Sequence, residues 1–217
     1  MATSLNRSDL LNYTLKQVYN FFPDSKNYNK KDIISSFNTN MERIEYCFSK
    51  IRNKYFFQNN DVLFKHLHGD QYSMFLYILS NTLYKNNYDL TLCEKLFLLN
   101  KSLFSLDAFY EIELPEIFLF VHPLGTVLGR AKYSNYLIVY QRCNIGSNHD
   151  IYPELGEHLT LHPGASILGK CHIGRNVKIA TDGLVIDKNI ENDIVYIGNP
   201  KNYIKKSLTD IDSIWLI

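Results

Sequence analysis

Seven histidines are the side chains of this sequence best suited to moving a proton near neutral pH. They are His66, His68, His122, His149, His158, His162 and His172. His66 and His68 are two residues apart, which places them on different faces of a helix and makes them a poor metal pair. The cysteines are Cys47, Cys93, Cys143 and Cys171. Their wide spacing without a CxxC pair predicts neither a zinc site nor a disulfide framework. A single histidine in a loop or solenoid is more often structural or simply exposed, so these residues are only candidates for acid–base chemistry, and no metal is expected.

Composition removes several classes of protein from consideration. The chain has 217 residues, 46% of them hydrophobic, and a net charge of +1, which gives no reason to expect a nucleic acid or an acidic membrane as partner. No stretch reaches the roughly 18 apolar residues that a membrane span needs. The N-terminus, MATSLNRSDL, lacks the basic start and apolar run of a secretory signal. We expect a cytoplasmic protein with reduced cysteines.

The first half of the sequence has the period of amphipathic helices. One apolar stripe with steps of three and four comprises Phe37, Met41, Ile44, Phe48, Ile51 and Tyr55. A second comprises Leu10, Leu11, Leu15, Val18 and Phe22. Ser8 is the predicted N-cap of that helix. Two more helices are predicted over residues 71–86 and 90–104, separated by Asn and Gly-Asp punctuation. Residues 1–105 are therefore predicted to form an α-helical domain.

The second half changes to a period of six. An aliphatic residue recurs at Leu155, Leu161, Ile167, Ile173, Ile179 and Val185. Upstream, the same step continues through Val121, Val127, Tyr133, Val139 and Ile145, and downstream Ile197 returns in phase. A period of six fits neither a helix nor a hairpin sheet, but it fits three short strands that make one triangular coil. The fold class is thus α+β: the helical domain, a parallel β-helix over residues 106–205, and a tail over residues 206–217.

One interruption of the repeat marks a loop. The step from Ile145 to Leu155 is ten residues, so Gly146–Glu154 is predicted to leave the coil. Loops on a regular scaffold commonly carry specificity.

Three stretches resemble the serine acetyltransferases, within the hexapeptide-repeat acyltransferase superfamily. They are HPLGTVLGRAKYSNYLIVYQRCNIG, YPELGEHLTLHPGASILGKCHIG and IGNPKNYI. The similarity covers about residues 100–205, and the N-terminal half only in outline. It implies that the parallel β-helix is left-handed, and that the protein is an acetyl-CoA-dependent O-acetyltransferase that transfers the acetyl group directly to an acceptor hydroxyl.

The resemblance places His122 as the catalytic general base. A base with a pKa near 7 takes the hydroxyl proton while the oxygen attacks the thioester carbonyl. Asp107 lies fifteen residues before His122, the spacing found in the family, and is expected to orient the imidazole. Glu111 and Glu113 are its substitutes if the coil starts differently. His158 and His172 fall at bends that tolerate many polar residues, and the role of His162 is open.

The resemblance also implies a cofactor site. The acetyl-CoA positions are Ser147, Pro163, Gly164, Thr181, Gly198 and Pro200. Lys178, Lys201 and Lys205 are candidates for the phosphates, although a solvated face is the simpler explanation of each. The pantetheine arm is expected in a groove between subunits, which predicts a homotrimer and leaves a hexamer open.

Departures from the family concern the acceptor. Serine acetyltransferases carry Asp before the catalytic histidine, where this chain has Val121, and an Arg-His pair where it has Ile151-Tyr152. His149 and Tyr152 are therefore acceptor-binding candidates, and Asp70 in HGDQY is either a third or a loop cap. The acceptor is serine or a similar small hydroxyl compound, or alternatively a sugar or nucleotide sugar of surface polysaccharide synthesis. A catalytically inactive solenoid that binds partners is the third hypothesis.

Overall fold

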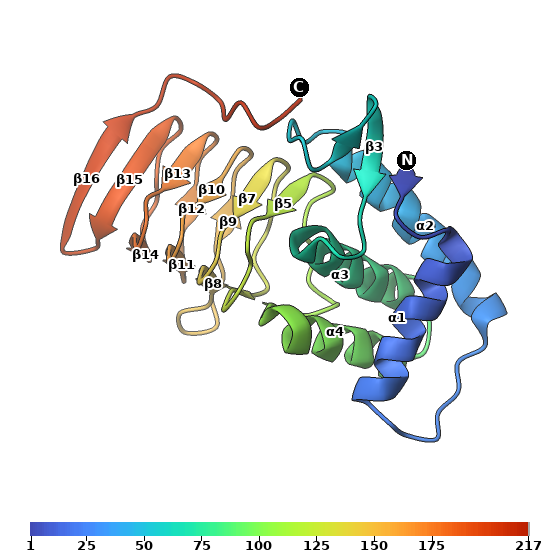
Figure 1. Ribbon diagram of the computed structural model, residues 1–217. Helices are drawn as coiled ribbons and strands as arrows, with labels where there is room; N and C mark the ends of the chain where they lie inside the picture. Colours follow the sequence, from blue (N-terminus) through green and yellow to red (C-terminus); the bar gives the residue numbers. More distant parts are fainter. Residues whose placement is uncertain (217) are drawn as a thin grey trace.

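The computed structural model describes residues 1–216, and it consists of a helical half followed by a β-solenoid (Figure 1). The helices are α1 (Arg7–Phe21), α2 (Lys30–Phe48), α3 (Gly69–Lys85) and α4 (Leu90–Phe104). A small sheet of order β1-β3-β2 accompanies them, with β1 at Ala2–Thr3, β2 at Phe57–Gln58 and β3 at Asp61–Phe64. No helix within residues 1–216 has the length and apolar character needed to cross a membrane.

The helix boundaries follow from their capping residues. Asn6 caps α1, and its side chain accepts the backbone N–H of Asp9 at 2.9 Å. The predicted cap, Ser8, lies inside the helix instead, because Asn6 already satisfies the free N–H group. The α3 and α4 helices match the predicted ranges to within two residues.

The long stripe predicted over residues 37–55 is correct only as far as Phe48, where α2 ends. Ile51 is buried, but through a β-bridge to Trp215, while Tyr55 is 49% exposed. The periodicity continues beyond the helix because residues 49–56 turn back against the same core.

The α3 helix lies at the centre of the helical half, between α2 and α4, and it also contacts β5 (Phe118–Phe120) of the solenoid. Its residues 71–83 are buried without exception. Polar members of the helix reach the chain that leads to the solenoid. The hydroxyl of Tyr77 donates to Ile112 O at 2.5 Å, and Asn81 Nδ2 donates to Tyr110 O at 2.9 Å. These bonds fix the helical half against the first coil.

Short parallel strands build the solenoid, apart from a final antiparallel strand, and three sheets form its sides. One sheet has the order β16-β15-β13-β10-β7-β5, a second β14-β11-β8-β6-β4 and a third β12-β9. The strands are β4 (Asp107–Ala108), β5 (Phe118–Phe120), β6 (Val127–Leu128), β7 (Leu137–Val139), β8 (Asn144–Gly146), β9 (Glu154–Leu155), β10 (Thr160–Leu161), β11 (Ser166–Leu168), β12 (His172–Ile173), β13 (Val177–Ile179), β14 (Leu184–Ile186), β15 (Ile194–Asn199) and β16 (Asn202–Ser207).

Rows of aliphatic and aromatic side chains stack through the interior of the solenoid. One row is Phe120, Val139, Leu161, Ile179 and Tyr196, and another is Leu128, Ile145, Ile167 and Val185. Each of these side chains is at most 1% exposed. A single coil cannot bury its own apolar face, so this stacking supplies the core.

The predicted inward positions are wrong by one residue at both ends of the solenoid. Phe120 and Leu128 point inward, whereas Val121 is half-buried and Val127 is 44% exposed. At the other end Tyr196 takes the inward position that was assigned to Ile197. The hexad phase holds from Tyr133 to Val185, apart from the predicted loop, and shifts where the first and last coils change length.

The C-terminal segment returns along the solenoid to the helical half (Figure 1). Trp215 forms the bridge to Ile51, and Arg52 N donates to Ile214 O at 2.6 Å. Ile217, the last residue of the predicted tail, lies outside the described residues.

Candidate active site

The corner that carries His122 is longer than the corners stacked on it. From Phe120 to the next inward residue, Leu128, the step is eight residues, whereas Val139 to Ile145 and the later equivalents take six. Two extra residues therefore bulge from the first corner. This corner joins β5 to β6 and includes the HPLG sequence of residues 122–125.

His122 has a left-handed backbone, with φ of 49°. The regular corners already contain one left-handed residue each, at Arg142, Gly164 and Asp182, and Gly125 holds that position in the first corner. His122 is thus an additional left-handed residue, and non-glycine residues adopt this conformation only at a cost. Its side chain is 73% exposed and available to a ligand.

Asp70 is the carboxylate that meets His122. Its Oδ1 accepts the backbone N–H of His122 at 3.0 Å and lies 3.7 Å from His122 Nδ1. Asp70 stands in the first turn of α3, where a negative charge is favoured by the helix dipole, and its side chain is 15% exposed. The residue that the sequence suggested as an acceptor contact or a loop cap therefore holds the extended corner from the helical half.

Asp107 is not placed against His122. Strand β4 pairs with β6 so that Asp107 lies beside Val127, and its carboxylate accepts from Lys101 Nζ at 2.6 Å. No hydrogen bond or ion pair within residues 1–216 joins Asp107 to His122. The reason is coil length: adjacent strands here are twenty residues apart, so a spacing of fifteen does not bring the two residues into register.

The two substitutes for Asp107 have partners of their own. Glu111 accepts from Arg130 Nη2 at 2.6 Å, and Glu113 pairs with Lys85 Nζ at 3.3 Å. Among the described residues, neither carboxylate forms a hydrogen bond or an ion pair with the His122 corner.

The predicted loop leaves the solenoid between β8 and β9. A bridge between Asn148 and Ile151 closes it, and its tip residues His149 and Asp150 have φ of 49° and 59°. Asn148 Nδ2 donates to Asp187 Oδ2 at 2.6 Å, which anchors the loop to a later coil. The Tyr152 ring packs beside the first coil, since a Cβ on Gly129 would lie 3.3 Å from Tyr152 Cε1.

The loop and His122 lie on opposite edges of one sheet. The His122 corner precedes β6, and the loop follows β8, which runs parallel to β6 and pairs with it. His149 and Tyr152 are therefore separated from His122 by the length of the strands. Within one chain, no hydrogen bond or ion pair among the described residues connects the loop to that corner.

The predicted cofactor positions divide between the same two edges. Pro163 and Gly164 precede β11, and Thr181 precedes β14, so all three share the edge of His122. Backbone hydrogen bonds join these corners to one another; for example, Asp182 N donates to Pro163 O at 2.9 Å. Ser147 lies on the loop edge.

The end of the solenoid holds the remaining cofactor positions and the lysines. Gly198, with φ of 110°, lies at the end of β15, and Pro200 lies in the turn to β16. Lys178 pairs with Asp212 at 3.3 Å and Lys205 with Glu191 at 2.6 Å, while Lys201 is exposed.

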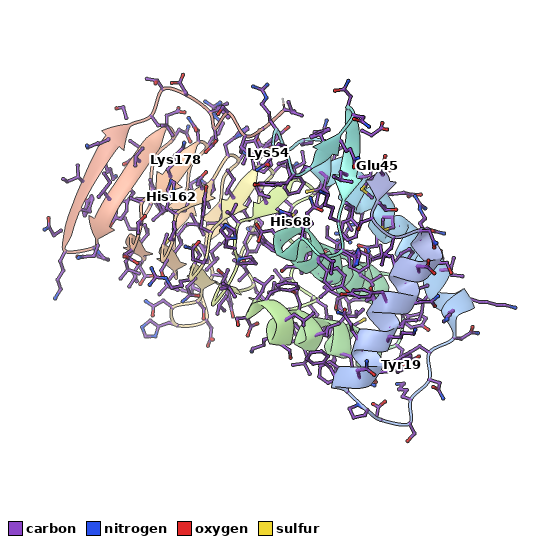
Figure 2. The ribbon with its side chains drawn as sticks, viewed as in Figure 1. Tyr19, Glu45, Lys54, His68, His162 and Lys178 are labelled. Atoms are coloured by element: carbon purple, nitrogen blue, oxygen red, sulfur yellow. The ribbon has the colours of Figure 1, made fainter. Side chains whose placement is uncertain are left out.

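Two of the other histidines stack on tyrosines. The His158 ring lies 4.3 Å from the Tyr136 ring and is parallel to it within 2°, and burial lowers the pKa of His158. The His162 ring stacks on Tyr140 at 5.5 Å. Its pKa is lowered first by burial and then by Lys178, which lies on the same side of the solenoid (Figure 2).

The last three histidines serve local structure or remain at the surface. His66 Nδ1 shares a hydrogen bond of 2.7 Å with Ser4 Oγ, and the side chain of His68 caps α3. His172 is exposed and lies 3.8 Å from Glu154 Oε2. Among the described histidines, His122 combines high exposure with a carboxylate and an irregular corner.

Comparisons with known proteins support one fold. No protein-family model matches the chain. A serine acetyltransferase of Synechococcus elongatus is 29% identical over 96 residues, which is 42% of this chain and 39% of that protein. The matched segment therefore spans well under half of the relative.

Solved serine acetyltransferases match over most of the chain. The Brucella abortus enzyme in complex with coenzyme A has a TM-score of 0.63 and 18% identity, covering 94% of this chain and 76% of that one. The Neisseria gonorrhoeae enzyme gives 0.65 and 19%, covering 81% and 72%, and the Vibrio cholerae enzyme gives 0.67 and 14%, covering 83% and 70%. The chain thus shares the fold of these solved serine acetyltransferases, the predicted α+β arrangement of a helical region followed by a left-handed β-helix of hexapeptide repeats.

Proposed function

We propose that the chain is an acetyl-CoA-dependent O-acetyltransferase with His122 as its general base. The imidazole takes the proton of an acceptor hydroxyl as the oxygen attacks the thioester carbonyl, and the proton then passes to the departing thiolate of CoA. A thioester is already activated, so no covalent enzyme intermediate is required. The observation that carries the proposal is the exposed His122 in an extended corner, held by Asp70.

Asp70 has two roles in this proposal. By accepting the backbone N–H of His122 it keeps the corner in its left-handed conformation. Its charge, 3.7 Å from Nδ1, stabilises the imidazolium that forms during transfer. Asp107 remains the alternative orienting carboxylate, but it must first leave Lys101 to act on His122.

Acetyl-CoA is the proposed donor, and no metal takes part. The stacked corners at Pro163–Gly164 and Thr181 present backbone groups along the edge that starts at His122. Such a row suits the extended pantetheine arm, and backbone N–H groups are suited to the oxyanion of the tetrahedral intermediate. The complex of the Brucella abortus enzyme with coenzyme A supports this choice of donor.

We propose a homotrimer because one chain holds the parts of the site on two edges. A neighbouring copy is able to bring its loop, with His149 and Tyr152, to the His122 edge of the first. Apolar side chains on this face and its edges remain exposed: Leu124 at 56%, Val127 at 44% and Ile151 at 48%. Covering them favours association. A hexamer of two trimers stays open.

The acceptor is the least defined part of the proposal. Serine needs partners for an ammonium and a carboxylate, yet Val121 and Ile151-Tyr152 offer none, and the loop from Gly146 to Glu154 contains no Lys or Arg. These observations favour the second candidate, a neutral sugar hydroxyl, against which the Tyr152 ring is able to pack. The buried thiols of the four cysteines support a reducing, cytoplasmic setting for either activity.

A screen with acetyl-CoA tests the proposal against the non-catalytic solenoid. Thiol release is followed with serine, simple sugars and nucleotide sugars as acceptors. Release that depends on an acceptor is expected. A folded protein that releases no thiol above the buffer rate with any acceptor supports the non-catalytic alternative.

A further inference from the structure

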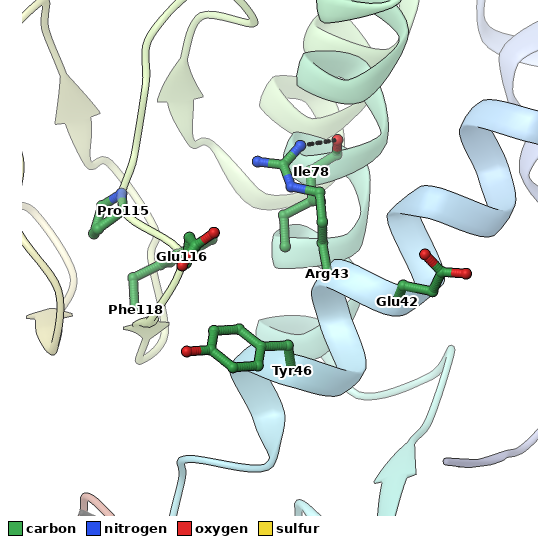
Figure 3. Close-up of a pocket in the computed structure, with 7 residues that line it drawn as sticks. All are labelled: Glu42, Arg43, Tyr46, Ile78, Pro115, Glu116 and Phe118. Carbon is green, nitrogen blue, oxygen red and sulfur yellow. Dashed lines mark hydrogen bonds between the residues drawn. The ribbon is translucent and has the colours of Figure 1, made fainter.

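A second concave site lies away from the His122 corner, where the helical half meets the solenoid. A cavity of about 210 Å³ opens between α2, α3 and the segment that precedes β5 (Figure 3). Its apolar walls are Tyr46, Ile78, Pro115 and Phe118. A dry cavity of about 150 Å³ is enough for one benzene ring, so this space suits a ring with a short chain.

Arg43 projects from α2 into this cavity. Its Nη1 donates to Thr82 Oγ1 at 2.7 Å and to Ile78 O at 3.5 Å, so both bonds use one nitrogen (Figure 3). None of the ion pairs formed by the side chains that the structure describes involves the guanidinium of Arg43. Burial lowers the pKa of Arg43, which records the loss of water around the charge. The remaining N–H groups of a guanidinium form a planar fork that matches a carboxylate.

Two acidic residues limit what enters. Glu42 and Glu116 also line the cavity, and both are exposed to solvent. Neither neutralises Arg43 by direct contact, but both oppose the approach of a multiply charged anion such as a phosphate ester. A single negative charge attached to an apolar body meets the guanidinium and the apolar walls with the least repulsion.

We propose that this cavity binds a small monocarboxylate with an aromatic or branched apolar body, its carboxylate paired with the Arg43 guanidinium. The apolar body lies between Tyr46 and Pro115, because Ile78 and Phe118, each 2% exposed, form only the floor of the cavity. Charge-assisted bidentate pairing gives the carboxylate its selectivity, and the walls contribute the burial. The cavity shares no residue with the His122 corner, so binding here is independent of acetyl transfer.

The ligand itself supplies the first test. Binding of 3-phenylpropionate and of its neutral amide to the full chain is measured by calorimetry at neutral pH, without acetyl-CoA. The carboxylate is expected to bind at least about tenfold more tightly than the amide, because only the carboxylate forms the charged pair. Equal binding of the two compounds, or no binding of 3-phenylpropionate at millimolar concentration, overturns the proposal.

Variants of the lining residues test whether the ligand binds in this cavity. Arg43→Met is expected to weaken 3-phenylpropionate binding at least about tenfold, whereas Arg7→Met, on the exposed surface of α1, leaves it unchanged. Tyr46→Ala, which alters a 46% exposed side chain, gives a second loss of affinity if Arg43→Met does not fold. Unchanged affinity in whichever of these cavity variants folds contradicts the assignment.

A comparison of L-phenylalanine with 3-phenylpropionate then distinguishes two sources of the same carboxylate chemistry. Tighter binding of the amino acid would show that its ammonium group pairs with Glu42 or Glu116. The natural ligand is then an amino acid. Weaker binding assigns the site to simple monocarboxylates. In either case, Arg43→Met must weaken the binding of both compounds.

Discussion

The first corner of the solenoid and the corners that stack on it perform different tasks. The later corners repeat a six-residue step with one left-handed residue each, such as Gly164 or Asp182, and their contacts are to neighbouring coils. The first corner has two extra residues, a second left-handed residue at His122, and a bond to Asp70 from the helical half. The regular corners allow the coils to stack, whereas the irregular first corner exposes the imidazole of His122 to solvent.

The largest effect is expected from removing the imidazole of the first corner. His122→Ala should lower kcat for acetyl transfer at least about a hundredfold while acetyl-CoA binding persists, as expected for loss of a general base. Steady-state thiol release and calorimetric titration with acetyl-CoA measure the two quantities. His172→Ala, at another exposed histidine of the solenoid, is the matched control. Near-normal turnover by His122→Ala would remove His122 from the mechanism and leave His149 as the next candidate.

Two carboxylates compete for the role beside His122. Asp70→Asn retains an oxygen for the His122 N–H but loses the charge, and we expect kcat to fall at least about tenfold. Asp107→Asn loses a half-exposed ion pair with Lys101 and should change kcat less. Parallel kinetics of the two variants decide between them. A larger loss in Asp107→Asn would favour the orientation predicted from sequence spacing over the contact in the structure.

The loop edge is expected to set the acceptor. Because Val121 and Ile151-Tyr152 offer no charged partners, serine should have a kcat/KM at least about tenfold below that of a suitable neutral hydroxyl compound. The two are compared at saturating acetyl-CoA. If serine is the best acceptor and Tyr152→His does not improve it, the argument from these substitutions is wrong.

The corner that contains His158 should influence how the stability of the protein depends on pH, and should not influence its activity. His158 Nδ1 is buried without a hydrogen-bond partner, and burial lowers the pKa of this histidine below 6.5. The unfolded chain therefore binds the proton more readily, so His158 should reduce the free energy of unfolding as pH falls below about 6.5, with no loss above it. His158→Phe retains a ring stacked on Tyr136 but cannot bind a proton. The denaturation midpoint of this variant should therefore change less than that of the wild type between pH 7 and 5.

The exposed His172 again supplies a control for that experiment. His172→Phe should leave the pH dependence of the midpoint as in the wild type, because its side chain is 70% exposed. An unchanged pH dependence in His158→Phe would show that the buried ring does not contribute.

Much of the architecture was predictable because it depends on local repetition. The six-residue step predicts the inward positions from Tyr133 to Val185, and the ten-residue step predicts the loop after β8. The ranges of α3 and α4 follow from their apolar faces and polar boundaries. In each case a feature repeated within a few residues was sufficient.

The site was harder to predict because its contacts do not repeat. The two extra residues before Leu128 shift the inward phase, and a pattern fitted through Val127 misses that shift. The contact between Asp70 and His122 joins residues 52 apart in sequence, and it depends on how α3 docks against β5. The only local signal was an acidic residue at the start of a helix, in HGDQY, which is equally expected of a helix dipole.

Isotopic tracing of the transferred group tests the central claim most directly. The wild-type protein is incubated with ¹³C-acetyl-CoA and the best acceptor of the screen, and the products are identified by NMR while thiol is counted. The account predicts a labelled oxygen ester on the acceptor and one CoA thiol released for each ester formed. Thiol release without labelled acceptor, or label on an acceptor nitrogen, would contradict O-acetyl transfer.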